Sequence, residues 1–299
     1  MNSIVSYKER GEGGKNSFRG NCSPKLINDL ATFLKVKEIA DYACGSGTTA
    51  DVAAQLGIES HCYDLHSGFN LLHDEIKERP EFIFSHPAYW DIIKYAGEQY
   101  SAEKVIQQYG YDPRSSDLSR TQPWENFLEE LNYCTMKQFA ALEKGGHMAI
   151  LVGDVKKKGK LFSIILEMIK PGKIKQIIIK AQHNCWSDSV SYSGKAFIPI
   201  VHEYVLLLQK ENALLFNVQV SKNGEVDIRD IEIPTWKNIV VSVLEEMGGK
   251  ASLDKIYEAI DGHKRTEVNR EWRAKIRQTL QIHPKDFYNI DCGVWALAA

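Results

Sequence analysis

The sequence lacks the marks of a metal site, a disulfide framework or a membrane protein. No apolar run approaches the ~20 residues of a membrane span, and the polar start of the chain lacks the apolar core of a signal peptide. No two cysteines have C-x-x-C spacing, which disfavours zinc and thioredoxin-like sites. We therefore expect no metal, no membrane partner, and free thiols in a cytoplasmic location. The scattered cysteines are Cys22, Cys44, Cys62, Cys134, Cys185 and Cys292.

The chain also lacks a strong excess of charge of either sign. It has 37 Lys and Arg against 39 Asp and Glu, a net charge of −2. Binding of nucleic acid through a global positive field is therefore excluded, and any such site must be a local basic patch. With 299 residues, 43% hydrophobic and 25% charged, the sequence suffices for one large soluble domain and a smaller one.

Strand-like and helix-like segments alternate over the first two thirds of the chain, after an arm at 1–19 that is flexible or ordered by a ligand. This alternation predicts an α/β fold, a doubly wound, mostly parallel sheet with helices on both faces. Two consecutive late strands predict an antiparallel hairpin at one edge. The predicted strands are 37–41, 59–64, 81–84, 146–152, 174–181 and 200–208, and the predicted helices are one from Ser23-Pro24 onward, 49–56, 124–142 and 161–169.

The last third of the chain changes character. We assign 1–212 to the first domain and 213–233, which is mixed and polar, to a linker with weak strand character. A second unit at 234–299 opens with Pro234-Thr235-Trp236 and shows helical spacing at 236–247, 253–260 and 269–281. Apolar and polar residues then alternate around a turn at 287–297, as in a small two-stranded wing.

A glycine turn is the strongest local signal. The strand that ends at Asp41 turns through Gly45 and Gly47 into a helix, as at nucleotide-type sites. Glycines let the backbone approach a ligand, and free N–H groups at a helix start attract negative charge. Asp64 ends the next strand, where doubly wound folds place a ribose-binding carboxylate. For two glycines alone, a tight turn without ligand is the alternative.

The whole string at 41–49, DYACGSGTT, resembles the D-P-F-C-G-S-G-T motif of S-adenosylmethionine-dependent amino-methyltransferases. The resemblance covers about 15–210 and implies a Rossmann-like methyltransferase domain with S-adenosylmethionine as cofactor. Cys44 lies within this motif, and no Pro-Cys pair of the cytosine-C5 enzymes is present, so a covalent mechanism is disfavoured. The implied cofactor-binding residues are Phe18, Asn21, Ser23, Asp41, Ala43, Cys44, Gly45, Ser46, Gly47, Thr48, Thr49, Asp64 and Leu65.

A second motif, FSHPAYW at 84–90, resembles the (D/N/S)-P-P-(Y/F) loop of enzymes that methylate exocyclic amino groups. In that loop the target base is flipped out and stacked on the aromatic ring. The first side chain and the next carbonyl accept the two amino hydrogens, so that positioning supplies most of the rate. The resemblance makes His86, Pro87, Tyr89 and Trp90 the catalytic candidates. Core packing is the alternative for the aromatic pair.

The loop departs from its family at two positions. His86 stands where the family has Asp, Asn or Ser, and Ala88 replaces the second proline. A neutral imidazole accepts one hydrogen bond and an imidazolium none, so activity is expected to fall at acid pH. Ala88 removes a restraint on φ. Two hypotheses remain open, a working enzyme with a variant loop and a catalytically impaired or non-catalytic subunit that still binds cofactor and DNA.

Two loops are expected on the cofactor side, where open sheets bind ligands. The first, 91–123, is rich in tyrosine, and the second is 183–196. Both are candidates to enclose a flipped base, with ordinary surface loops as the alternative. A lysine cluster at 156–160 beside Asp154 is a candidate for phosphate contact or a solvated loop, and His202 and Glu203 are expected to be structural. The loop residues of interest are Tyr95, Tyr100, Tyr109, Tyr111, Arg114, Arg120, Trp186, Tyr192 and Lys195.

The second unit carries a local basic excess, seven Lys and Arg against two Glu over 263–285. Its segment 269–280 resembles the recognition helix of a winged helix domain attached to restriction and modification enzymes. Trp272, Ile276 and Leu280 recur at helical spacing and are expected in the core. A protein-binding winged helix is the alternative to DNA contact in the major groove. The DNA-binding candidates are Arg270, Arg273, Lys275 and Arg277.

These features lead to one preferred hypothesis, a site-specific DNA methyltransferase of a bacterial or phage-type cytoplasm. Adenine N6 is favoured slightly over cytosine N4, because Trp90 fits the cytosine group but the Ser of that group is missing. Double-stranded DNA is the expected partner, with a restriction enzyme or a second methyltransferase subunit as a further alternative. An RNA methyltransferase is the third hypothesis, disfavoured because no RNA-binding module is recognisable.

Overall fold

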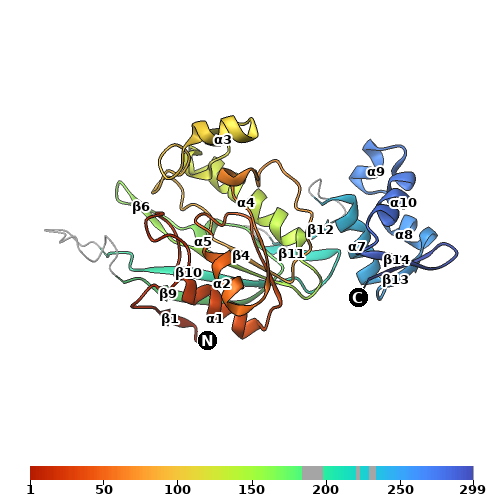
Figure 1. The fold of residues 1–299 in the computed structure, drawn as a ribbon, viewed down its shortest axis with the longest axis horizontal. Helices are drawn as coiled ribbons and strands as arrows, with labels where there is room; N and C mark the ends of the chain where they lie inside the picture. Colours follow the sequence, from red (N-terminus) through yellow and green to blue (C-terminus); the bar gives the residue numbers. More distant parts are fainter. Residues whose placement is uncertain (184–197, 220–222, 229–233, 299) are drawn as a thin grey trace.

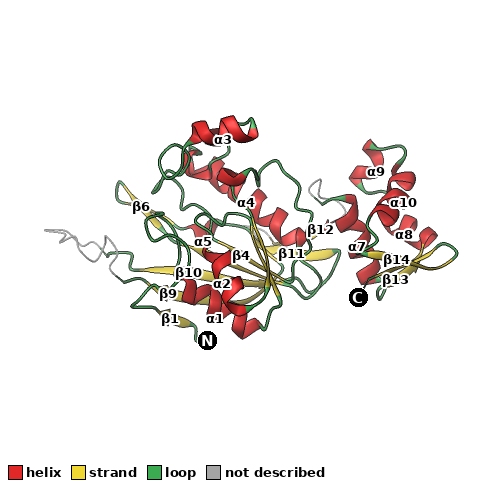
Figure 2. Ribbon diagram, viewed as in Figure 1, coloured by secondary structure: helices red, strands yellow, loops and turns green. Residues whose placement is uncertain are grey.

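The computed structural model describes residues 1–183, 198–219, 223–228 and 234–298. A larger α/β part carries the N-terminus, and the C-terminal unit forms a smaller lobe beside it (Figure 1). Among the described helices, none is both long enough and apolar enough to cross a membrane. Helices and strands are distributed through both parts (Figure 2).

A seven-stranded sheet organises the larger part, in the order β1-β9-β10-β5-β4-β2-β3. Only β10 runs antiparallel to its neighbours, so the prediction of a mostly parallel sheet is confirmed. The strands are β1 (Ile4–Ser6), β2 (Glu38–Asp41), β3 (Glu59–Cys62), β4 (Phe82–Ser85), β5 (His147–Val152), β9 (Lys173–Ala181) and β10 (His202–Gln209).

The predicted edge hairpin is present, but not at the edge. β9 and β10 pair antiparallel, with β10 between β5 and β9, while β1 pairs with the outer side of β9. The outer N–H and C=O groups of β9 need partners, and the start of the chain supplies them. The arm at 1–19, expected to be flexible or ordered by a ligand, therefore contains a short strand of the sheet.

Alternate residues of the central strands face two separate cores, as the period of a strand requires. Phe82 and Phe84 of β4 pack with Leu26 and Leu30 of the first helix on one face. Ile83 packs on the other face with the long helix α4. The helices are α1 (Pro24–Leu34), α2 (Thr48–Leu56), α3 (Ala102–Tyr109), α4 (Trp124–Ala141) and α5 (Ile164–Glu167).

Short elements fill the connections. A hairpin precedes α5, so the helix expected over 161–169 is shorter than predicted. One helix, α3, lies within the insertion at 91–123, where none was expected. The hairpin strands are β6 (Val155–Lys157) and β7 (Lys160–Phe162), and single 3-10 turns lie at Leu65–Ser67, Pro113–Ser115 and Leu118–Arg120.

The segment predicted as a linker belongs in part to the larger body. β11 (Leu215–Gln219) pairs with β8 (Lys170–Pro171) and with β12 (Asn223–Asp227). Phe216 is buried, and its ring lies 5.1 Å from that of Phe139 on α4. The first domain therefore extends beyond 212, because the apolar side of β11 completes its core.

The C-terminal unit combines four helices with a three-stranded antiparallel sheet of order β13-β15-β14. The three predicted helices and the two wing strands are present, and one five-residue helix, α9, was not predicted. Its elements are α7 (Trp236–Glu246), β13 (Lys250–Ser252), α8 (Leu253–Ile260), α9 (Lys264–Val268), α10 (Trp272–Ile282), β14 (Phe287–Asp291) and β15 (Val294–Leu297).

A buried arginine ties the C-terminal unit to the larger part. The guanidinium of Arg79 donates to the carbonyl of Asn238 (3.2 Å), the hydroxyl of Ser242 (3.1 Å) and the carboxylate of Glu245 (2.7 Å). The amide of Asn238 in turn donates to the carbonyl of Ile76 (3.3 Å). Helix α7 is therefore held against the segment that precedes β4.

Candidate functional site

Asp41 holds the glycine turn together. Its carboxylate accepts the backbone N–H of Ala43 (3.0 Å) and the hydroxyl of Thr49 (2.5 Å) on α2. Gly45 and Gly47 take φ values of +52° and +86°, a region that favours glycine. A side chain at Gly45 would also place its Cβ 3.0 Å from the ring of Phe18. The two glycines are therefore required by the geometry of the turn.

The carboxyl of Asp41 is only 3% exposed. Burial raises its pKa to about 7, although the hydrogen bonds from Thr49 and Ala43 act in the opposite direction. Asp41 therefore titrates near neutral pH. Burial likewise raises the pKa of the Cys44 thiol, so the thiolate that a nucleophile needs is disfavoured.

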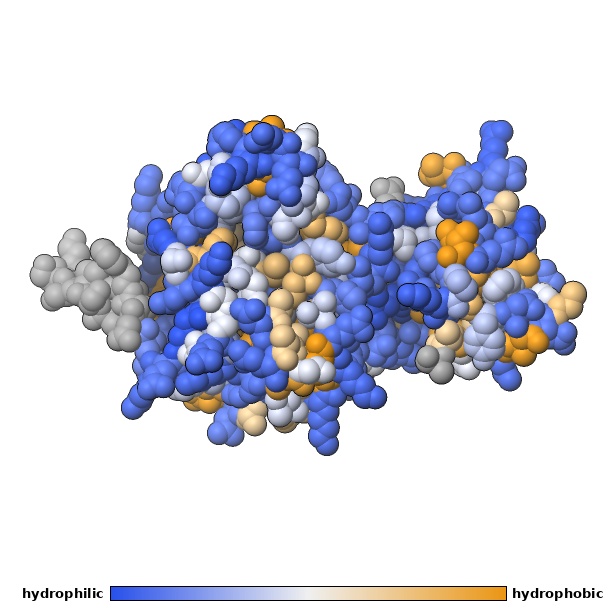
Figure 3. Space-filling model, viewed as in Figure 1, coloured by the Kyte–Doolittle hydropathy of each residue, from blue (hydrophilic) through white to orange (hydrophobic). Residues whose placement is uncertain are grey.

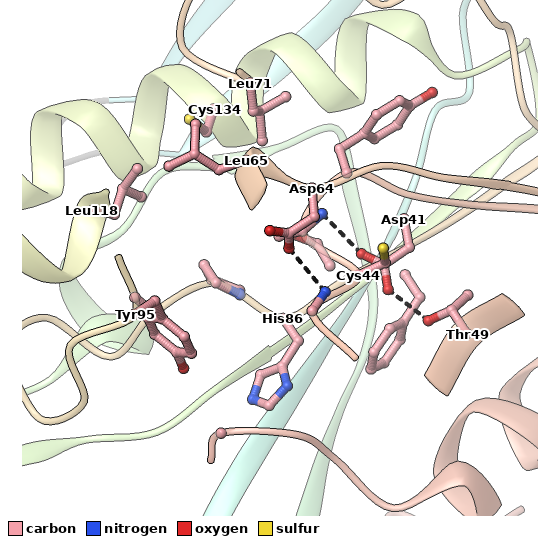
Figure 4. A pocket seen from close by; sticks show the side chains of 18 of the residues that line it. Asp41, Cys44, Thr49, Asp64, Leu65, Leu71, His86, Tyr95, Leu118 and Cys134 are labelled. Carbon is pink, nitrogen blue, oxygen red and sulfur yellow. Dashed lines mark hydrogen bonds between the residues drawn. The ribbon is translucent and has the colours of Figure 1, made fainter. Parts of the chain in front are cut away.

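Asp64 follows β3 and faces the turn (Figure 4). Its carboxylate accepts hydrogen bonds from the backbone N–H groups of Gly45 (2.8 Å) and His66 (3.1 Å). It also lies 2.6 Å from Nδ1 of the His66 ring, a third hydrogen-bond contact. The hydrogen bond to Asp64 raises the pKa of His66 against the effect of burial. Because a carboxylate has about four acceptor positions, one remains on the oxygen that faces Gly45.

A cavity beside this turn gathers most of the residues that the sequence assigned to the cofactor. Gly47 caps α2 without lining the cavity, and Ser23 lines an adjacent cleft. Leu65, Leu118 and Tyr95 lie across the cavity from Asp41 (Figure 4). The predicted residues that line it are Phe18, Asn21, Asp41, Ala43, Cys44, Gly45, Ser46, Thr48, Thr49, Asp64 and Leu65.

Phe18 forms an aromatic wall of the cavity with two tyrosines that were not predicted there. Tyr95 and Tyr100 come from the insertion at 91–123, which the sequence placed around a flipped base. Tyr95 stacks on Phe18 with centroids 6.0 Å apart, and Tyr100 lies 5.3 Å from His66. The tyrosine content of the insertion was a visible signal, but its position over the turn depends on tertiary contacts.

The remaining insertion residues serve the loop itself. Tyr111 donates to the carbonyl of Leu65, and Tyr109 packs over Gly68. Arg114 pairs with Asp112 (2.9 Å), and Arg120 bonds the carbonyl of Ala96. These contacts are internal, so the expectation that the two arginines face a base is not supported. Trp186, Tyr192 and Lys195 lie outside the described residues.

His86 and Pro87 follow β4 and border both the cavity and a second, larger cleft, of about 1280 Å³ against about 140 Å³. Burial lowers the pKa of His86 to about 4, so the ring is neutral near pH 7. Its Nε2 lies 3.0 Å from the hydroxyl oxygen of Tyr89. Tyr89 lines the cleft rather than the cavity.

Trp90 contradicts the catalytic assignment. It is 6% exposed, and its ring packs against Trp124 (5.3 Å) and Phe162 (4.9 Å). Its indole N–H donates to the carbonyl of Thr121 (3.2 Å), and it lines neither the cavity nor the cleft. Core packing, the alternative for the aromatic pair, therefore describes Trp90, whose backbone has a φ of +50°.

The second cleft is basic. Its described lining residues include five lysines and arginines but only two carboxylates, those of Asp154 and Glu203. The hydroxyl of Ser163 donates to Asp154 (2.8 Å). The cleft therefore offers positive charge next to the loop at 86–89. The basic residues are Lys8, Arg10, Arg19, Lys156 and Lys180.

The basic face of α10 is exposed as predicted, while Trp272, Ile276 and Leu280 are buried. The guanidinium of Arg273 lies over the Tyr257 ring (5.6 Å), and that of Arg277 donates to the Tyr257 hydroxyl (2.9 Å). On the face shown in Figure 3, this unit carries hydrophilic and hydrophobic patches side by side. The exposed basic residues are Arg270, Arg273, Lys275 and Arg277.

No model of a known protein family matches the sequence, and no curated protein matches it. Several solved methyltransferase structures show a weak similarity. TrmN from Thermus thermophilus is 14% identical with a TM-score of 0.32, over 65% of this chain and 51% of TrmN. TehB from Haemophilus influenzae is 10% identical with a TM-score of 0.30, over 62% of each chain.

A third similar structure is the glycopeptide N-methyltransferase MtfA complexed with sinefungin. It is 11% identical with a TM-score of 0.24, over 70% of this chain and 77% of MtfA. The chain thus spans only about half of TrmN and 62% of TehB.

Proposed function

We propose that this protein transfers a methyl group from S-adenosylmethionine to an exocyclic amino group of a DNA base, adenine N6 in preference to cytosine N4. One observation carries the proposal. His86 and Pro87 border both the cavity beside the glycine turn and the basic cleft. A loop in that position can hold an amino group that enters from the cleft against a donor in the cavity.

The cavity residues fit the cofactor. The remaining acceptor position of Asp64 suits a ribose hydroxyl, and the aromatic wall of Phe18 and Tyr95 suits an adenine ring. Above its raised pKa of about 7 Asp41 is ionised, and its negative charge beside the turn then favours a cationic ligand. S-adenosylmethionine, when bound there, supplies an activated methyl group.

The loop supplies acceptors for the amino group. Neutral His86 accepts one amino hydrogen, and the carbonyl of Pro87 accepts the other. The nitrogen lone pair would then be directed at the methyl group, and no covalent intermediate is needed. The N–C bond would form as the bond between methyl and sulfur breaks, the demethylated cofactor would leave, and one amino proton would pass along its hydrogen bond to His86 and on to solvent. The slight preference for adenine rests on the sequence alone, because the first loop position lacks the Ser of the cytosine group.

The C-terminal unit is proposed to be a winged helix that binds double-stranded DNA. Its element order, α7-β13-α8-α9-α10-β14-β15, ends in a two-stranded wing next to the exposed basic face of α10. Such a helix enters the major groove, and its cations contact phosphates and base edges. RNA is the competing substrate for the catalytic part, and the test below separates the two.

The test measures methyl transfer from isotope-labelled S-adenosylmethionine to unmethylated genomic DNA and, separately, to unmodified total RNA. Product nucleosides are resolved after digestion. With the wild type we expect label in N6-methyl-2′-deoxyadenosine. The His86→Leu variant should lose this label while it still binds the cofactor. Label only in RNA would reassign the substrate, and no label with normal cofactor binding would contradict the enzyme hypothesis.

A further inference from the structure

We propose that Lys180, Glu203 and Tyr89 form a positioning chain that holds His86 in the Nε2–H tautomer and leaves Nδ1 as the hydrogen-bond acceptor. The function of that acceptor, to receive an amino hydrogen of the substrate, rests on the proposed methyltransferase activity. The tautomer itself does not, because it follows from hydrogen bonds within the protein.

The positioning chain begins at an ion pair between residues of two paired strands. Lys180 of β9 and Glu203 of β10 are direct cross-strand partners. The ammonium of Lys180 lies 2.5 Å from Oε2 of Glu203, and the two side chains are only 12% and 9% exposed. Burial acts to raise the pKa of Glu203, but the positive charge of Lys180 brings that pKa below its ordinary value. Glu203 is therefore ionised at neutral pH.

The second step concerns the single hydroxyl hydrogen of Tyr89. Its oxygen lies 2.8 Å from Oε1 of Glu203. An ionised carboxylate only accepts hydrogen bonds, so Tyr89 must donate to Glu203. Burial and the charge of Glu203 raise the pKa of Tyr89, which keeps this hydrogen on the phenol.

The third step fixes the imidazole. Nε2 of His86 lies 3.0 Å from the Tyr89 oxygen, whose hydrogen is already committed to Glu203. That oxygen can only accept, so Nε2 must carry the hydrogen of the neutral ring. Nδ1 then has a lone pair. In the opposite tautomer, two acceptors would face each other across 3.0 Å.

This arrangement meets a need that the variant loop creates. An Asp, Asn or Ser side chain carries an acceptor oxygen in any state, whereas a neutral histidine has one acceptor whose position depends on the tautomer. The charged groups that act on His86 are Glu203 and Lys180, and Tyr95 and Cys22 face Tyr89. Glu203, which the sequence marked as structural, therefore becomes a positioning residue.

The test reads the tautomer directly. Long-range ¹H–¹⁵N correlation spectra of histidine-labelled protein distinguish Nε2–H, Nδ1–H and doubly protonated rings, and the His86→Asn variant assigns the His86 signal. We expect pure Nε2–H in the wild type. Tyr89→Phe, which keeps the ring and removes the hydroxyl, should give a mixture of both tautomers.

Tyr204→Phe is the matched control, because it removes a hydroxyl from the separate His202–Tyr204 pair (2.7 Å). It should leave the His86 signal unchanged. Glu203→Gln, which keeps an acceptor for Tyr89, should preserve more of the Nε2–H form than Glu203→Leu. An Nδ1–H wild type, or a Tyr89→Phe spectrum like that of the wild type, would overturn the proposal.

Kinetics separate this proposal from the proposed function. In Tyr89→Phe, kcat for methyl transfer should fall about fivefold, the effect of one lost hydrogen bond. The Kd for S-adenosylmethionine should not change. A wild type without methyl transfer would instead contradict the proposed function, while the spectra would still decide the tautomer.

Discussion

At position 86 an imidazole stands where the loops that the sequence resembles have an oxygen acceptor, and its proposed chemistry depends on two neighbours in the sheet. Burial keeps the ring neutral, and the chain from Lys180 through Glu203 and Tyr89 orients it. The sequence identified His86, but not this support, because Lys180 and Glu203 meet only when β9 and β10 pair. It also misplaced Trp90, since sequence position does not show which way a side chain turns.

The pH dependence of methyl transfer is the first prediction. Burial lowers the pKa of His86 from 6.5 to about 4, so the neutral ring persists through mildly acid pH. We expect the contribution of His86 to kcat to stay constant from pH 8 to pH 5 and to fall near pH 4. His86→Asn should lack this acid limb, because an amide oxygen does not titrate there. A limb near pH 6.5 that is absent from the His86→Asn profile would contradict the account.

Asp41 gives a second prediction, about stability. Its pKa is raised from 3.8 to about 7 in the folded protein, so the folded state binds the proton more tightly than the unfolded chain. The resulting stability is present below pH 3.8 and is lost as the pH rises through 7. Asp41→Asn avoids that loss and should raise the free energy of unfolding at pH 8 by up to about 4 kcal/mol.

Urea unfolding at pH 5 and pH 8 measures this difference, which should be smaller at pH 5. The same variant should bind S-adenosylmethionine more weakly, because it lacks the negative charge beside the turn. A variant that is less stable than the wild type at pH 8 would contradict the assignment.

Among the elements, those with a strong periodic pattern were predicted well. The central strands and α4 lie close to their expected ranges, because buried strands are continuous apolar runs and α4 has a clear helical face. The elements that were missed include β1 and α9, of three and five residues, and the eight-residue helix α3 within the insertion. Short elements are stabilised by their partners, and those contacts cannot be read locally.

Helix α7 carries the third prediction. Glu245 neutralises Arg79, which is buried between the two parts of the protein. Glu245→Leu leaves an unpaired buried cation and should lower the free energy of unfolding by about 3 kcal/mol. The double variant Arg79→Met, Glu245→Leu should lose less. Denaturant unfolding of both single variants and the double variant measures the coupling, and strictly additive losses would contradict a buried ion pair.

The whole molecule combines the larger α/β part with a C-terminal unit that carries the exposed basic residues of α10 and is docked through Arg79. The fourth prediction concerns DNA binding by that unit. Arg273→Gln with Arg277→Gln removes two exposed cations of α10. If both contact phosphates, the slope of log affinity against log salt concentration should fall by about 2, with weaker binding.

Fluorescence anisotropy with a DNA duplex over a series of salt concentrations measures this slope. Lys255→Gln, on the exposed side of the neighbouring helix α8, is the control and should leave the slope unchanged. Because Arg277 bonds Tyr257, the unfolding temperature of each variant is compared first. An unchanged slope in a stable double variant would reject α10 as the DNA-binding helix.

The proposed function requires that the His86–Pro87 loop deliver an amino group to the methyl donor. Single-turnover transfer from preloaded, labelled S-adenosylmethionine to unmethylated DNA tests it most directly, comparing the wild type with His86→Asn and His86→Leu. The account predicts transfer by the wild type and His86→Asn, and a loss of at least about tenfold in His86→Leu, as when a positioned acceptor is removed. Equal rates in all three proteins, or no transfer by a wild type that binds the cofactor, would contradict it.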